Sequence, residues 1–216
     1  MDGSTVVTAG ANLDVEEVVC ADARVPNVGG LGLDQAGVRL GEDGRISVDE
    51  HQRTSAAGVY AAGDVTGPPW LTNRAVATGT VAALNALGAA EQVRADHIPR
   101  SVNTRPPLAA VGLTAEQAAA SGRRVGTPTA DLALSARAAI LGDPRGALKL
   151  VVDQDTEEIL GAHMVGVEST EVIGQIVLAM EAGLGYRQLL RPSHVHPSMA
   201  EVVGLAVRLE DLARNA

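Results

Sequence analysis

The sequence contains no phenylalanine, one tryptophan, two tyrosines and a single cysteine among its 216 residues. One cysteine excludes an intramolecular disulfide and a cysteine-rich metal site, and we expect Cys20 to be a buried small hydrophobic residue. No apolar run approaches the roughly 20 residues that span a bilayer. The N-terminus also lacks the basic-then-apolar pattern of a signal peptide. We therefore expect a soluble, cytoplasmic protein that does not enter a membrane.

Clustered positive charge is missing as well. The chain has 17 lysines and arginines against 26 acidic residues, a formal net charge of −9, and no segment forms a basic stripe. A nucleic-acid-binding surface needs clustered cations to neutralise phosphates. The sequence thus predicts no nucleic-acid partner.

Small apolar residues and glycine make up for the missing aromatics. Hydrophobic residues are 46% of the chain, mostly Ala, Val and Leu, and there are 24 glycines. This is enough apolar material for one large domain or two small ones. Glycine suits the close backbone packing that such a core requires.

The first part of the chain, residues 1–96, alternates short apolar segments with turns. We predict a strand within residues 17–33, a hairpin that turns at Asp43-Gly44, and a buried strand over residues 58–65. A helix should follow from Thr72 to Leu87, ended by Gly88. The polar segment "EQVRADHIPR" then predicts a domain boundary, which divides the chain into residues 1–96 and 97–216.

The second part, residues 97–216, has strands followed by helices. We expect a strand interrupted by Pro106-Pro107, and a helix opened by a capping box of Thr114 and Gln117. Three strands over residues 136–166, a helix over 168–182 and a C-terminal helix complete the pattern. Strands without βαβ alternation predict an antiparallel sheet with helices, an α+β arrangement.

The strand over residues 58–65 ends in Gly63-Asp64. A glycine there permits a sharp turn or the close approach of a ligand to the backbone. We see no cation near Asp64 in sequence, so its carboxylate is free to accept hydrogen bonds from hydroxyl groups. The N–H groups of the helix beginning at Thr72 would attract an electron-rich ring oxygen. An ordinary turn at the end of a core strand is the alternative.

Three alternatives are open for "HVHPSMAE". His194 and His196 would share one face of an extended segment and could bind a metal, but no cluster of further ligands accompanies them, so we predict no metal site. Pro197 could simply fix a structural histidine in a turn. The third alternative pairs His196 with Glu201, because a carboxylate on one imidazole nitrogen raises the basicity of the other. His51, His97 and His163 have no comparable context, and we expect them to be surface or structural residues.

These motifs occur together in one order. "TSAAGVYAAGDV", "LTNRAVATG", "VGLTAEQA", "EILGAHMVG" and "HVHPSMAE" make the chain resemble the pyridine nucleotide-disulfide oxidoreductases, the family of lipoyl dehydrogenase and glutathione reductase. The resemblance covers nearly the whole chain. The chain lacks the G-x-G-x-x-G loops and the Cys-x4-Cys disulfide that occur in the N-terminal part of the family's proteins. The sequence is therefore similar to the C-terminal half of such an enzyme, whether through truncation, a split gene or a mis-called start.

The resemblance implies a fold, a cofactor and site residues. The fold would be the returning, C-terminal part of an α/β FAD-binding domain, followed by an α+β dimerisation domain. FAD would lie against Gly63, Asp64, Leu71, Thr72 and Ala75. His196 and Glu201 would act as an acid–base pair on the thiol, across the dimer from the partner's disulfide.

The complete enzyme would use NAD(P)H to reduce a small-molecule disulfide or electrophile. We also expect a homodimer, since the helix over 168–182 and Val202, Val203, Leu205 and Leu209 carry more apolar surface than a small sheet can cover. The alternative is a non-catalytic dimerisation or interaction module that pairs with a separate N-terminal chain.

Overall fold

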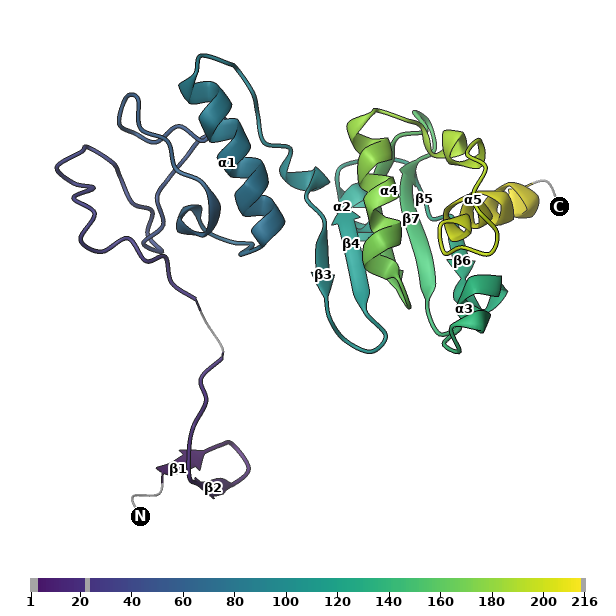
Figure 1. The fold of residues 1–216 in the computed structure, drawn as a ribbon, viewed down its shortest axis with the longest axis horizontal. Helices are drawn as coiled ribbons and strands as arrows, with labels where there is room; N and C mark the ends of the chain where they lie inside the picture. The colour runs from purple at the N-terminus through teal and green to yellow at the C-terminus, as the bar shows by residue number, and fades with distance from the viewer. Residues whose placement is uncertain (1–3, 22–23, 215–216) are drawn as a thin grey trace.

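The computed structural model describes residues 4–21 and 24–214. The chain runs from an N-terminal β-hairpin, through a segment that contains one long helix, into an antiparallel sheet flanked by helices (Figure 1). The hairpin, which was not predicted, pairs β1 (Ser4–Val7) with β2 (Asn12–Val15). The predicted mixture of α/β and antiparallel α+β structure is confirmed.

The predicted helix of the first part is present as α1 (Thr72–Ala86). It ends where the sequence indicates, because Gly88 has a φ of 95°, in the left-handed region that glycine adopts easily. A single 3-10 turn, η1 (Gly63–Thr66), precedes it. This turn carries the Gly63-Asp64 pair.

The strands predicted before α1 are wrong in extent. Residues 58–65 make only an isolated bridge, Arg53 with Tyr60, and then enter η1, and residues 17–21 and 24–33 form no strand. The hairpin at Asp43-Gly44 is reduced to one bridge, Leu40 with Ile46. Short strands need hydrogen-bonded neighbours to be stable, and within the described residues these segments have only isolated bridges. Cys20 is consequently exposed rather than buried.

The second part forms a sheet in which every pairing is antiparallel. The strand order is β3-β4-β8-β7-β5, with β6 also paired to β7. The bounds of the strands are β3 (Arg100–Val102), β4 (Leu108–Gly112), β5 (Val125–Gly126), β6 (Thr129–Asp131), β7 (Ala147–Asp153) and β8 (Ile159–Val165). The prolines at 106 and 107 interrupt the first strand as predicted, because proline cannot donate to a ladder.

Helices and 3-10 turns connect these strands. They are η2 (Ala95–His97), α2 (Ala115–Ala120), η3 (Leu132–Leu134), α3 (Ala136–Ile140), α4 (Ser169–Glu181), η4 (Tyr186–Leu190) and α5 (Glu201–Arg214). The capping box is confirmed: the Gln117 N–H donates to Thr114 Oγ1 at 3.2 Å, and the Thr114 N–H donates to Gln117 Oε1 at 2.9 Å. The strand predicted at residue 136 is instead α3, because Ser135 caps it by accepting the Ala138 N–H.

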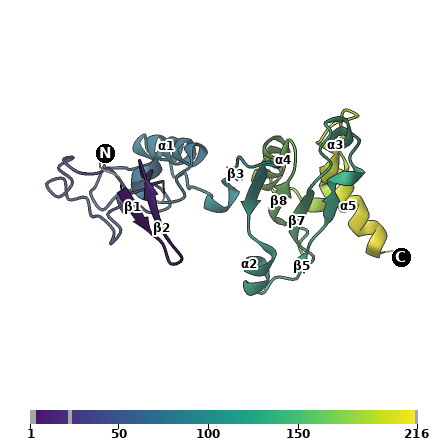
Figure 2. The ribbon, with the colours of Figure 1, turned by 90° about the horizontal axis from the view of Figure 1, so that it is seen from below.

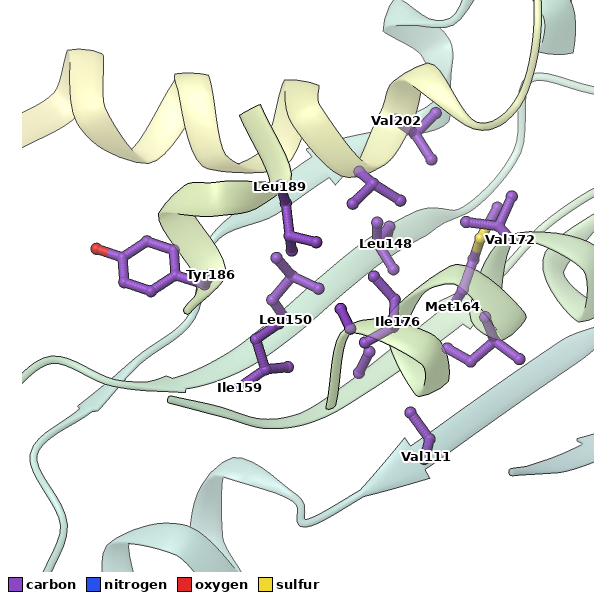
Figure 3. Close-up of a cluster of buried hydrophobic side chains, with 14 of the residues drawn as sticks. Val111, Leu148, Leu150, Ile159, Met164, Val172, Ile176, Tyr186, Leu189 and Val202 are labelled. Carbon is purple, nitrogen blue, oxygen red and sulfur yellow. The ribbon is translucent and has the colours of Figure 1, made fainter. Parts of the chain in front are cut away.

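The sheet is buried on both faces. Leu148, Leu150 and Val152 of β7 pack with α4 and α5 in the main core (Figure 3), and the intervening Val151 packs with Ala118 of α2. Figure 2 shows α4 and α2 on opposite sides of the sheet. Alternate residues of a strand point to opposite faces, so Leu150 and Val151 of β7 enter the cores on the two sides of the sheet.

Candidate functional site

The Gly63 corner is held against α1 by backbone hydrogen bonds. Gly63 has a φ of 74°, its N–H donates to Thr78 Oγ1 at 2.9 Å, and its carbonyl accepts from Thr66 Oγ1 at 2.7 Å. A Cβ at position 63 would lie 3.2 Å from the Cβ of Ala75. The positive φ and this close contact together explain why glycine stands at this point.

Arg74 is the functional neighbour that sequence reasoning missed. Its guanidinium donates to the carbonyls of Gly63 (3.2 Å) and Gly67 (2.9 Å) and to Thr66 Oγ1 (3.1 Å), so it clamps η1 to α1. Burial lowers the pKa of Arg74, and the charge of Asp64 opposes this shift. Asp64 has no cation beside it in sequence, but the fold brings the charge of Arg74 close enough to interact with it. The sequence signal for this contact was the position of Arg74 as the third residue of the predicted helix. From there its side chain reaches back to the preceding turn.

The other residues predicted to contact a cofactor surround this corner. Asp64 is exposed, and its carboxylate makes no hydrogen bond within the described residues. Thr72 is the exposed first residue of α1, and Leu71 precedes it as an N-cap without a side-chain hydrogen bond. The structure thus brings together a hydrogen-bond acceptor facing solvent and a helix N-terminus that no side chain caps.

This corner fits the middle of a flavin nucleotide. A solvent-facing carboxylate suits polyol hydroxyls, and free helix N–H groups suit a ring carbonyl. The positive φ of Gly63 makes the chain turn at the same point. The five residues Gly63, Asp64, Leu71, Thr72 and Ala75 lie on one corner, but they provide nothing for a pyrophosphate.

The second candidate site lies at the start of α5. His196 Nδ1 is 3.1 Å from Glu201 Oε1, and Glu201 Oε2 accepts the Ser198 N–H at 2.9 Å. The Ser198 N–H and then the His196 ring hold the pKa of the Glu201 carboxyl below its usual value. The His196 side chain is 70% exposed. Its Nδ1 engages the carboxylate, which leaves Nε2 as the nitrogen that can exchange a proton with another molecule.

A cavity of about 360 Å³ opens beside this pair. His196 and Glu201 line it, together with His194, residues around Ser135, and the following turns of α5. The His194 Nε2 and Ser198 Oγ atoms are buried without a hydrogen-bond partner. Buried polar atoms are normally paired, so the surroundings of this cavity hold unused hydrogen-bonding capacity.

The remaining histidines join separate segments of the chain. His51 Nδ1 is 2.7 Å from the Glu91 carbonyl, His97 Nδ1 is 2.9 Å from Glu181 Oε1, and His163 Nε2 is 3.0 Å from the Leu113 carbonyl. Within residues 4–21 and 24–214, no group of three or more His, Cys, Asp or Glu side chains could hold a metal ion. None of the helices in this described part is long and apolar enough to cross a membrane.

Comparison with known proteins gives two family matches. The pyridine nucleotide-disulphide oxidoreductase dimerisation domain matches residues 98–207, and the pyridine nucleotide-disulphide oxidoreductase domain matches residues 2–79. Among curated proteins, dihydrolipoyl dehydrogenase from Thermus scotoductus is 39% identical over 94% of this chain and 43% of its own length. The probable pyridine nucleotide-disulfide oxidoreductase RclA from Escherichia coli is 36% identical over 88% of this chain and 44% of its own length.

Solved structures agree with these matches. A Cu(II) complex of the flavoprotein disulfide reductase RclA from Escherichia coli superposes with a TM-score of 0.83 at 34% identity, over 96% of this chain and 48% of that one. LpdA from Mycobacterium tuberculosis superposes with a TM-score of 0.89 at 29% identity, over 95% of this chain and 45% of that one. The chain spans less than half the length of these relatives. It belongs to the pyridine nucleotide-disulphide oxidoreductase family, and it contains the family's dimerisation domain.

Proposed function

We propose that the chain works as the C-terminal half of an FAD-dependent NAD(P)H:disulfide oxidoreductase. The single observation that carries this proposal is the His196–Glu201 pair, in which a carboxylate fixes an exposed histidine that lines a cavity. Such a pair is the usual arrangement of a general acid–base. Family membership supports the rest, and we keep the boundary between residues 96 and 97 as the proposed division between the flavin-binding and dimerisation parts.

Each part of this chain has a role in the proposed reaction. Asp64 accepts hydrogen bonds from the ribityl chain, Gly63 and Ala75 allow its close approach, and Leu71 and Thr72 present the N-terminus of α1 to the ring. When bound, FAD relays two electrons from the nicotinamide to the disulfide. His196 then delivers a proton to the departing sulfur, and Glu201 stabilises the charged imidazole before that transfer.

An aspartate replacement tests the flavin role. Asp64→Ala in the complete enzyme should lower FAD affinity about 10- to 150-fold, since a hydrogen bond to a charged group contributes roughly 1.5–3 kcal/mol. Glu42→Ala is the matched control, because Glu42 is an exposed acid on a turn of the same part of the chain. Yellow colour retained after gel filtration, and NAD(P)H-driven bleaching of it, provide the readouts. Equal retention by the Asp64 and Glu42 variants would remove Asp64 from the site.

The second candidate function is a non-catalytic dimerisation or interaction module. One observation favours it: the main core draws every buried residue from positions 109–207, so this part has a core of its own. Complete protein that stays colourless when supplied with FAD, yet still forms a dimer, would support this candidate over the oxidoreductase.

We also propose a homodimer, to which two of the residues expected from sequence contribute no surface. Val202 and Val203 are buried in the chain's own core, so they leave no apolar surface for a partner. Leu134 (61% exposed) and Val195 (80% exposed) instead flank the His196 cavity. Apolar side chains exposed around a site indicate an interface, and two-fold pairing is the commonest arrangement.

Light scattering at micromolar concentration should give twice the chain mass. Val195→Asp and Leu134→Asp should shift the protein to monomer, because each places a charge in the apolar contact. Val7→Asp, in the β1–β2 hairpin that lies apart from α5 (Figure 1), is the control and should remain dimeric. A wild-type monomer would contradict the dimer, and a dimer that tolerates both aspartates would place its interface elsewhere.

A further inference from the structure

One face of α5 runs along the His196 cavity. Glu201, Leu205 and Arg208 all line this cavity. Residues four and seven apart lie on the same side of a helix. Seven residues at 1.5 Å each place Arg208 about 10 Å along the axis from Glu201. The cavity therefore extends from a proton-transfer pair at one end to a guanidinium at the other.

Arg208 is exposed and has no hydrogen bond or ion pair within the described residues. The other arginine of α5 differs, since Arg214 Nε lies 2.9 Å from Glu210 Oε1. Arg187, in the neighbouring η4, is likewise paired, with Glu157 and Asp211. Arg208 thus presents an uncompensated positive charge to the cavity, in a chain whose net charge is −9.

The remaining polar groups of the cavity leave room for an anion. Glu201 is the acidic residue that lines it among the described residues, and both of its oxygens are already engaged, by His196 and by the Ser198 N–H. The buried Nε2 of His194 has no partner. A ligand that satisfies it would relieve a desolvation cost. An anionic group in the cavity is therefore attracted toward Arg208 and away from Glu201.

We propose that Arg208 determines substrate specificity by binding a carboxylate or phosphate carried about two helical turns from the reacting disulfide. This inference rests on the proposed function, since it assigns the substrate class of the same site: a small disulfide with an anionic tail. His196 serves the sulfur at one end of the cavity. Arg208 holds the tail at the other end, through the charged fork that suits oxyanions.

Lipoate and lipoamide form a matched pair of probes, because they share a dithiolane ring and chain and differ only in the charge of the tail. In the complete FAD-loaded enzyme, Arg208→Gln should raise KM for lipoate about 3- to 10-fold, the range for a partly exposed charged hydrogen bond. KM for lipoamide and kcat for both should stay within twofold, roughly the scatter expected at a surface site. Arg208→Lys should recover part of the lipoate effect, and Arg214→Gln should change neither substrate.

Added salt gives an independent readout. It should raise KM for lipoate in wild type and much less in Arg208→Gln, because salt screens exposed charges. Equal changes for lipoate and lipoamide in Arg208→Gln, or no change in either, would overturn the proposal.

Direct binding separates this inference from the proposed function. The histidine side-chain NMR signals of the wild-type protein should shift when lipoate is added, those of His194 and His196 most, and the shifts should weaken in Arg208→Gln. Turnover of neither disulfide, with these shifts present, would contradict the oxidoreductase function and keep the anion site. Turnover of both disulfides, without any preference for lipoate that depends on Arg208, would contradict the anion site and keep the oxidoreductase function.

Discussion

His196→Ala is expected to slow the disulfide half-reaction by roughly 10²–10⁴-fold, the usual contribution of a general acid–base. The reason lies in the arrangement at the start of α5, where Glu201 occupies one imidazole nitrogen of His196 and His196 lines the cavity. Reduction of the flavin by NAD(P)H should change little, because no proton from this pair enters the hydride transfer. Stopped-flow measurement of the complete enzyme separates the two half-reactions.

Two further variants sharpen this prediction. Glu201→Gln should keep the fold and the flavin, while it removes the negative charge that favours the protonated imidazole. The pH profile of the disulfide half-reaction should then move to lower pH. His51→Gln is the control, because His51 contacts the Glu91 carbonyl far from α5 in sequence and should leave both half-reactions unchanged.

Mixed dimers test whether the pair acts on the partner's disulfide. The family resemblance implies one site built from two subunits. A heterodimer of a His196→Ala subunit and a subunit lacking its redox cysteine should then regain activity, because one complete site is reassembled. If His196→Ala slows only flavin reduction, or leaves both rates unchanged, the histidine is structural and the catalytic role is wrong.

The second part of the chain was predictable because its signals are local. The capping box of Thr114 and Gln117 and the helix over residues 168–182 each depend on neighbours within a few residues, and both are present. The exception is α3, where Ser135 caps a helix that the apolar run from Ala136 did not reveal. A short apolar run does not distinguish strand from helix, and only the cap decides it.

The first part was less predictable because its strands depend on partners outside their own sequence. Residues 58–65 have the composition of a buried strand, but a strand requires a neighbour to accept its hydrogen bonds, and here it makes a single bridge. The Gly63 corner also depends on a contact that is not local in sequence. Its residues were proposed from sequence, whereas the hydrogen bonds by which Arg74 holds η1 against α1 are seen only in the folded structure.

The incomplete corner leads to the last prediction, that this 216-residue chain alone binds FAD weakly or not at all. Asp64 and the N-terminus of α1 can contact the middle of the nucleotide. The charged pyrophosphate requires a glycine-rich loop and a helix N-terminus of its own. The sequence contains no G-x-G-x-x-G. A few hydrogen bonds on an exposed corner contribute too little to offset the cost of fixing a flexible nucleotide.

Fluorescence quenching during an FAD titration measures this directly. The isolated chain should show no saturation at micromolar FAD, whereas the same chain joined to or mixed with a segment that carries the G-x-G-x-x-G loop should bind FAD stoichiometrically and turn yellow. Far-UV circular dichroism of the isolated chain controls for folding, since α4, α5 and the sheet have a core independent of the flavin corner. Tight, stoichiometric FAD binding by the 216 residues alone would mean that the corner at Gly63 and Asp64 is a complete site, contrary to the half-site that its contacts indicate.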